Sequence, residues 1–160
     1  ILPLFARLFP LPQTVASQAE LVTLQGEPDV SLDLTFRSGP IVIEMDYSVD
    51  PDHARPFYDA MLKVRNGRLR NGGFDWSLSR DIADPSRWTE RYHCPTWGDY
   101  LRMRERFTQA DREAHEHMVA TLLPGSRIQV RRCLERPFGS VRWKADTPDL
   151  KQDAIGYIGP

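Results

Sequence analysis

The sequence predicts an α+β fold with the element order β-α-β-β-α-β, and three observations lead to this prediction. Residues 41–49 alternate between apolar and polar side chains, as a half-buried strand does, and residues 127–135 alternate in the same way. Between these two strands, apolar residues recur at helical spacing in two segments. The helical segments enclose two further strand-like runs, which are joined by a turn that contains Pro85.

The first strand, residues 41–49, separates apolar from polar side chains. Successive side chains of a strand point to opposite faces, so its apolar set is expected to lie in the core. That face carries Ile41, Ile43, Met45, Tyr47 and Val49, and the opposite face carries Glu44, Asp46 and Ser48.

The segment after this strand has the start and stop signals of a helix. Asp50 can cap a helix whose first position is Pro51. The pair Gly72–Gly73 is typical of a helix end. Between these signals, the apolar residues expected to face the core are Phe57, Met61 and Leu62.

Residues 74–82 and 88–94 are predicted to form a hairpin, and two short charged helices and a last strand follow it. On the strand 74–82, alternation places Phe74, Trp76 and Leu78 on one face. The apolar sides of the two helices are expected to be formed by Trp97, Tyr100 and Leu101, and then by Ala110, Ala114, Met118 and Leu122. The last strand covers residues 127–135.

This order of elements is the ferredoxin-like arrangement, an antiparallel four-stranded sheet with its helices on one face. Because the other face is left uncovered, we expect a homodimer in which two sheets pack face to face, a dimeric α+β barrel. In this topology the first strand separates the third strand, with Cys94, from the fourth strand, with Cys133. We therefore predict that both thiols are free.

Composition excludes several classes of function. The chain has 160 residues, of which 41% are hydrophobic, enough to bury one good core. Its net charge of −1 predicts no bulk attraction to nucleic acid or to anionic lipid. Two cysteines fit neither a disulfide scaffold nor a zinc site, and they favour a reducing compartment. The sequence has no Walker loop, dinucleotide-binding loop or nucleophile elbow, so we predict no cofactor, no metal and no nucleic-acid partner.

The candidate site is an aromatic pocket between the sheet and the helices. Two interpretations of its rings stay open: they fill the core, or they line a cavity for a flat aromatic ligand. The candidate residues are Trp76, Trp88, Trp97 and Tyr100 as walls, with His93 or Arg104 as the polar anchor. His115 and His117 point about 200° apart on a helix, cannot hold one metal together, and are predicted to lie on the surface.

Several ordered motifs carry a resemblance to a known family. They are "W-x-L-x-x-D-x-A-D-P-x-R-W-x-E" over residues 76–90, "W-x-x-x-L-R" over residues 97–102, and "ERFTQAD" up to Asp111. A strand with Tyr47 and Val49 leading to Pro51 precedes them, and "FPLP" and "LDLT" lie upstream. In these features the chain resembles the C-terminal soluble domain of bacterial major facilitator transporters of the enterobactin-exporter-like family.

The resemblance implies an organisation and a location. Residues 1–39 would be the exit of the last membrane helix and a linker, residues 40–136 the ferredoxin-like domain, and residues 137–160 a C-terminal extension. The domain would lie in the cytoplasm, attached to the membrane portion of an inner-membrane exporter of drugs or siderophores. Its fold is similar to the antibiotic-biosynthesis monooxygenases, some of which oxidise polycyclic quinols without a cofactor, whereas others bind and degrade haem.

The chain departs from the haem-degrading relatives at two positions. Met45 stands about where they have an Asn, and Arg104 stands about where they have a His. A guanidinium stays protonated and cannot ligate iron, so we predict no haem. The leading hypothesis is a dimerisation or regulatory domain without catalysis, and the alternative is a small cofactor-independent monooxygenase that acts on aromatic or quinol compounds.

Overall fold

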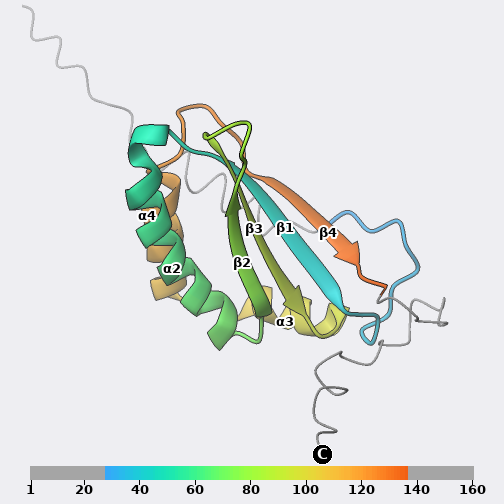
Figure 1. Ribbon diagram of the computed structural model, residues 1–160. Coiled ribbons are helices and arrows are strands. Elements are labelled where there is room, and N and C mark those ends of the chain that lie inside the picture. Colours follow the sequence, from blue (N-terminus) through green and yellow to red (C-terminus); the bar gives the residue numbers. More distant parts are fainter. Residues whose placement is uncertain (1–27, 137–160) are drawn as a thin grey trace, which may run out of the picture.

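Four antiparallel strands form one sheet in the computed structural model, which describes residues 28–136. The strands are β1 (Ile41–Ser48), β2 (Phe74–Arg80), β3 (Arg87–Cys94) and β4 (Gln129–Leu134). Their order in the sheet is β2-β3-β1-β4, as the ferredoxin-like arrangement requires (Figure 1). Cys94 and Cys133 are therefore separated by β1, and both are free, as predicted.

The helices begin and end at the signals in the sequence. A 3₁₀ turn (Pro51–His53) follows Asp50, whose side chain accepts a hydrogen bond from the Asp52 amide, and α2 continues over Ala54–Arg70. Gly72 then adopts a φ of 101°, which glycine tolerates best. Thr96 caps α3 (Trp97–Glu105), and Thr108 forms a capping box at the start of α4 (Gln109–Val119).

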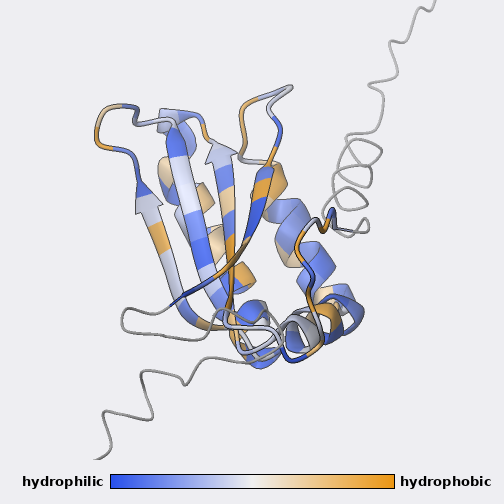
Figure 2. Cartoon of the chain, turned by 90° about the vertical axis from the view of Figure 1, so that its right-hand side faces the viewer, coloured by the Kyte–Doolittle hydropathy of each residue, from blue (hydrophilic) through white to orange (hydrophobic). Residues whose placement is uncertain are grey.

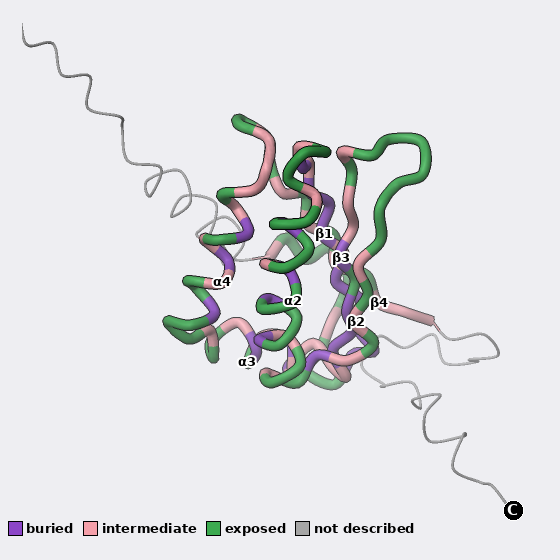
Figure 3. Tube along the Cα trace, turned by 60° about the vertical axis from the view of Figure 1, so that its left-hand side comes forward, coloured by how far each residue is buried: buried purple, intermediate pink, exposed green. Residues whose placement is uncertain are grey.

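Helices α2 and α4 pack beside each other over one face of the sheet, which we call the inner face (Figures 1 and 3). The core lies between this face and the helices, and it contains Ile43, Tyr47, Phe57, Met61 and Met118. Leu62, expected in the core, is instead exposed, because Val64 completes the buried stripe of α2. Figure 2 shows that the helices are largely hydrophilic, with separate hydrophobic positions along them.

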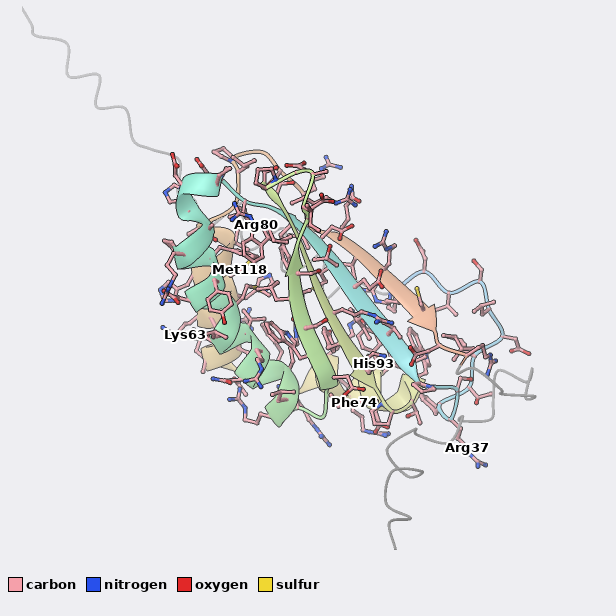
Figure 4. All side chains as sticks on the ribbon, in the orientation of Figure 1. Arg37, Lys63, Phe74, Arg80, His93 and Met118 are labelled. Atoms are coloured by element: carbon pink, nitrogen blue, oxygen red, sulfur yellow. The ribbon has the colours of Figure 1, made fainter. Side chains whose placement is uncertain are left out.

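A β-bulge in β2 contradicts the prediction that Phe74 lies on the same face of the sheet as Trp76 and Leu78. Phe74 pairs with His93 and Ser77 pairs with Arg91, so β2 has one extra residue between these pairs. Asp75 in the bulge has a φ of 49°. The extra residue turns Phe74 to the face opposite Trp76 and Leu78, whereas simple alternation would keep all three together. Phe74 therefore stacks on His93, with ring centroids 5.3 Å apart (Figure 4).

The second strand also ends earlier than residue 82. Asp81 accepts hydrogen bonds from the amides of Ala83 and Asp84, and Asp84 accepts from Ser86, so a turn stiffened by side chains begins after Arg80. This turn leaves Ile82 fully exposed.

The opposite, outer face of the sheet carries a ladder of charges across the strands. Glu44 on β1 lies 2.9 Å from Arg131 on β4 and 3.6 Å from Arg91 on β3. Asp46 likewise lies 3.3 Å from Arg87 and 3.6 Å from Arg131. The acidic central strand is thus flanked by basic residues on both sides.

The predicted flanking segments fall mostly outside the described residues. Residues 137–160 and residues 1–27 of the predicted linker lie there. Residues 28–40 are described, and within them the carbonyl oxygens of Phe36 and Ser38 accept hydrogen bonds from the amides of Gly98 and Trp97 at the start of α3. Over residues 28–136, no helix combines the length and apolar character that crossing a membrane requires.

Candidate functional site

A cavity lies between the inner face of the sheet and the three α-helices. Its volume is about 60 Å³. Its walls combine aromatic, thioether and charged side chains from β1, β3, α2, α3 and α4. The lining residues are Met45, Val64, Gly67, Arg68, Asn71, Tyr92, Tyr100, Met103, Arg104, Phe107, Asp111 and His115.

Next to the cavity, β3 carries a fully buried carboxylate, that of Glu90. Its Oε1 accepts hydrogen bonds from Arg68 Nε at 3.2 Å and from Trp76 Nε1 at 2.9 Å. Its Oε2 accepts from the Tyr47 hydroxyl at 2.7 Å. Every oxygen of this carboxylate therefore has a partner, which a buried charge requires.

Arg68 joins this carboxylate to the cavity. Its guanidinium lines the cavity, lies over the Tyr92 ring at 5.0 Å from the centroid, and approaches Met45 Sδ at 3.6 Å. A guanidinium over an aromatic face gains a cation–π attraction that strengthens when water is excluded. The Arg68 head is therefore fixed by a charge on one side and by a ring on the other.

The buried network sets the protonation of its members. Burial alone raises the pKa of the Glu90 carboxyl, but the Arg68 charge and the accepted hydrogen bonds outweigh it, so the pKa is lowered. Burial and the Glu90 charge raise the pKa of Tyr47 well above its ordinary value. Glu90 is thus a carboxylate at neutral pH, and Tyr47 is a neutral phenol that donates to it.

The local sequence explains how these side chains meet. Glu90 alternates with Trp88 and Tyr92 on β3, so it must point to the inner face. The bulge in β2 turns Trp76 to the same face and brings its indole N–H to the carboxylate. Sequence reasoning missed Glu90, although its place between two aromatic residues of an alternating strand was a usable signal.

A second carboxylate, Asp111, lies at the start of α4 and is also fully engaged. It accepts hydrogen bonds from the amide and hydroxyl of Thr108 at 2.9 and 2.8 Å, from Arg70, and from Asn71 at 3.4 Å. Burial raises the pKa of this carboxyl, whereas the bonds from Thr108 and Arg70 lower it, and the net direction is down. Gly67 makes this packing possible, because a Cβ there would lie 2.4 Å from Asp111 Oδ1.

His115 corrects the prediction of a surface histidine. It is 2% exposed and lines the cavity, because it lies one helical turn before Met118 on the buried side of α4. Burial, together with the positive charge of Arg68, lowers the pKa of His115 to about 4, so the ring is neutral at pH 7. His117, two residues later, is exposed as predicted.

The six predicted site residues do not form one pocket. Tyr100 and Arg104 line the cavity, and Arg132 Nε donates to the Tyr100 hydroxyl at 2.6 Å. Trp76 donates its indole N–H to Glu90, and the Trp88 ring packs against the Phe57 ring with centroids 5.3 Å apart. These two indoles belong to the core and not to the cavity wall.

Trp97 and His93 lie elsewhere. Trp97 lines a separate groove with residues 29–34 and β4. His93 pairs with Val42 and therefore points to the outer face, where its Nε2 lies 3.2 Å from Glu135. His93 cannot anchor a ligand on the inner face, because strand alternation places it on the opposite side of the sheet.

The arrangement of groups suits binding better than reaction. Both carboxylates are occupied by donors, and burial raises the pKa of the Cys94 thiol to about 12, so this thiol stays protonated. Within residues 28–136, no cluster of His, Cys, Asp and Glu could hold a metal ion. The polar residues that line the cavity include two that only donate, Arg68 and Arg104, and others that can accept as well, among them Asn71, Tyr100 and His115.

Comparison with known proteins places the chain in two ways. A family model described as "Transmembrane secretion effector" matches residues 2–138. No curated protein matches the chain. Among solved structures, a "putative antibiotic biosynthesis monooxygenase" from Caulobacter crescentus is similar, with a TM-score of 0.54 and 15% identity over 64% of this chain and 94% of that one.

Two further structures support the same fold. A "putative antibiotic biosynthesis monooxygenase" from Nitrosomonas europaea has a TM-score of 0.53 and 16% identity, over 64% of this chain and 95% of its own. A conserved protein from Methanosarcina mazei has a TM-score of 0.51 and 12% identity, over 60% and 92% of the two chains. At these identities the likeness shows a shared ferredoxin-like fold.

Proposed function

Because the chain belongs to the transmembrane secretion effector family and so has a transporter-related role, we propose that it is the cytoplasmic C-terminal domain of an inner-membrane exporter. In this proposal, residues 40–136 regulate or dimerise the exporter without catalysing a reaction. The observation that carries it is the extent of the family match, which runs over residues 2–138 and so includes both the segment before the sheet and the domain itself.

The inner face supports the absence of catalysis. A general base or nucleophile must be free to reach a substrate. Glu90 and Asp111 are held by several donors each, and Cys94 is a buried, protonated thiol. These groups are arranged to keep their present protonation states and not to exchange protons with a ligand.

The location and role are testable in the complete transporter. We expect a fluorescent protein that folds only in the cytoplasm to be bright when fused after residue 160, and a phosphatase that is active only outside the cytoplasm to be inactive there. Deleting residues 40–136 should change the export rate of the transporter while its membrane portion remains inserted. An active phosphatase fusion, a dark fluorescent fusion, or unchanged export at equal protein level contradicts the proposal.

The outer face is the surface that we propose for dimerisation. Its ladder of acidic and basic residues offers complementary charges to a second copy related by a twofold axis. Stable interfaces bury about 1,600 Å² in total, which a four-stranded face can supply. Sedimentation of the 160-residue chain should give a dimer that dissociates in Glu44→Lys. A monomer at micromolar concentration would contradict this.

The monooxygenase alternative has one observation in its favour. The cavity contacts three aromatic rings, those of Tyr92, Tyr100 and Phe107, which suits an aromatic substrate. Its size argues against polycyclic quinols, since sites for such ligands are typically several hundred Å³. Oxygen uptake by the purified chain in the presence of one-ring and polycyclic quinols decides between the two roles, and a rate above that of the free quinol supports catalysis.

A further inference from the structure

A buried ring nitrogen in the cavity wall, that of His115, has no protein partner. His115 Nε2 is buried and makes no hydrogen bond. The His115 ring lines the cavity and forms an edge-to-face pair with Phe107, with ring centroids 6.5 Å apart. A buried ring nitrogen without a partner has lost its hydrogen bond to water and gained none in return, which is unfavourable. Native proteins rarely leave such a group unpaired, unless a ligand or water completes it. His115 therefore points to a molecule that occupies this space.

The charges around the cavity indicate the sign of that molecule. Both nearby carboxylates are taken: Glu90 by Arg68 and its neighbours, and Asp111 by Thr108 and Arg70. Arg68 and Arg104 both line the cavity, together with Asp111. At His115 the influence of the Arg68 charge on the pKa exceeds the opposing influence of Glu90. The local potential is thus positive, which favours an anion.

The space limits the size of the anion. A cavity needs roughly 10–15 Å³ to hold one water-sized group. A cavity of about 60 Å³ therefore accepts roughly four to six such groups. The walls on the other sides are apolar: Met45, Val64, Met103 and Phe107. A short carbon chain can pack there.

We propose that the cavity binds a small organic carboxylate, whose oxygens accept hydrogen bonds from His115 Nε2–H and from the Arg104 guanidinium. The carbon end of the ligand packs against Met103 and Phe107. This proposal deepens the regulatory role proposed above by naming the ligand class. It is tested on the separate chain, so its failure is distinguishable from a wrong placement in the exporter.

Binding is coupled to protonation of the ring. A carboxylate beside His115 favours the imidazolium and raises its pKa. Binding therefore strengthens as pH falls through the pKa of the bound state toward the free-state value of about 4. The charged groups around the ring are Arg68 on α2, Glu90 on β3, Arg104 on α3 and Asp111 on α4. Of these, the two acids stay ionised above pH 5, since their own pKa values are lowered. His115 is therefore the group in this set that changes its charge.

The experiment titrates the 160-residue chain with acetate, propionate and benzoate between pH 5 and 8, and follows the ring protons of His115 and of its neighbour Phe107 by NMR. In His115→Phe, the Phe107 protons report binding. Propionamide, which has a similar shape without the charge, serves as the matched ligand control. The variants are His115→Phe and Arg104→Gln, each matched with an exposed neighbour on the same helix, His117→Gln and Arg102→Gln.

We expect a saturable shift of the His115 signals with at least one acid and an increase in its pKa. Affinity should fall about tenfold or more, equivalent to about 1.4 kcal/mol or more, in His115→Phe and in Arg104→Gln, but not in the two control variants. Propionamide should bind at least about tenfold more weakly than propionate. No saturable shift with any acid, equal binding of propionamide, or equal loss in the control variants would overturn the proposal. Arg104→Gln keeps the test decisive if His115→Phe does not fold.

Discussion

The two faces of the sheet use the same residue types in opposite ways. On the inner face, Glu90 and Arg68 form one ion pair, with the carboxylate fully buried and the guanidinium side chain 13% exposed. On the outer face, Glu44 and Asp46 form several pairs with arginines whose side chains are about half exposed. The number of pairs therefore does not indicate their energetic importance. Burial does indicate it, because a charge on the inner face that loses its partner cannot be solvated by water instead.

The largest expected effect comes from breaking the inner pair. Glu90→Gln leaves the Arg68 guanidinium without its counter-charge, and we expect the free energy of unfolding to fall by about 3–5 kcal/mol. Urea unfolding measures the change. The matched control is Glu44→Gln on the outer face. If the two variants lose the same stability, the distinction between the faces is wrong.

A double variant sharpens the same point. Arg68→Met together with Glu90→Gln removes both charges, and it should recover most of the stability lost in Glu90→Gln alone, because no buried charge remains unpaired. A double variant as unstable as the single one would show that the lost stability comes from packing and not from the charge.

The next largest effect is a dependence of stability on pH from His115. The pKa of His115 falls from 6.5 to about 4 on folding. Between these pH values, His115 is protonated in the unfolded chain but neutral in the folded chain. Stability from this group is complete above pH 6.5, is lost progressively as pH falls to 4, and is then constant, a loss of about 3 kcal/mol in total. We expect His115→Phe to flatten the curve in this window and His117→Gln to preserve it. Unfolding in urea at several pH values checks this.

The smallest expected effect lies on the outer face. In the monomer, where the outer face is open to water, Glu44→Gln should change the free energy of unfolding by about 1 kcal/mol or less, because exposed pairs gain little from their attraction. In the same variant, the free energy of unfolding should also depend less on salt concentration, because two exposed ion pairs are removed. A loss above about 2 kcal/mol would mean that the outer ladder is less open to water than its arginines indicate.

Much of the fold follows from alternation and turn residues, whereas the site does not. Alternation locates the strands, and the ferredoxin-like order of elements separates Cys94 from Cys133. Neither reveals the extra residue that turns Phe74 away from Trp76. A bulge depends on how two strands pair through their hydrogen bonds, so the apolar pattern of one strand alone does not predict it.

The site was hidden by the expectation that charged residues lie outside. Glu90 and His115 both occupy core positions by their spacing, Glu90 between Trp88 and Tyr92 and His115 three residues before Met118. Their polarity argued for the surface, whereas their periodicity argued for burial, and periodicity was the better guide. Only the partners that meet them, Arg68 above all, come from distant parts of the chain and need the folded structure.

The bulge in β2 also bears on how the chain behaves at high concentration. Strand β2 is an edge of the sheet, and a regular edge offers its free amides and carbonyls to the edge of another molecule. The irregular backbone at Asp75, with its φ of 49° and an exposed carboxylate, interrupts that row. A second chain would find only the short run from Ser77 to Arg80 to extend. One residue thus both positions Trp76 for the buried network and interrupts one of the two edges at which another chain could extend the sheet.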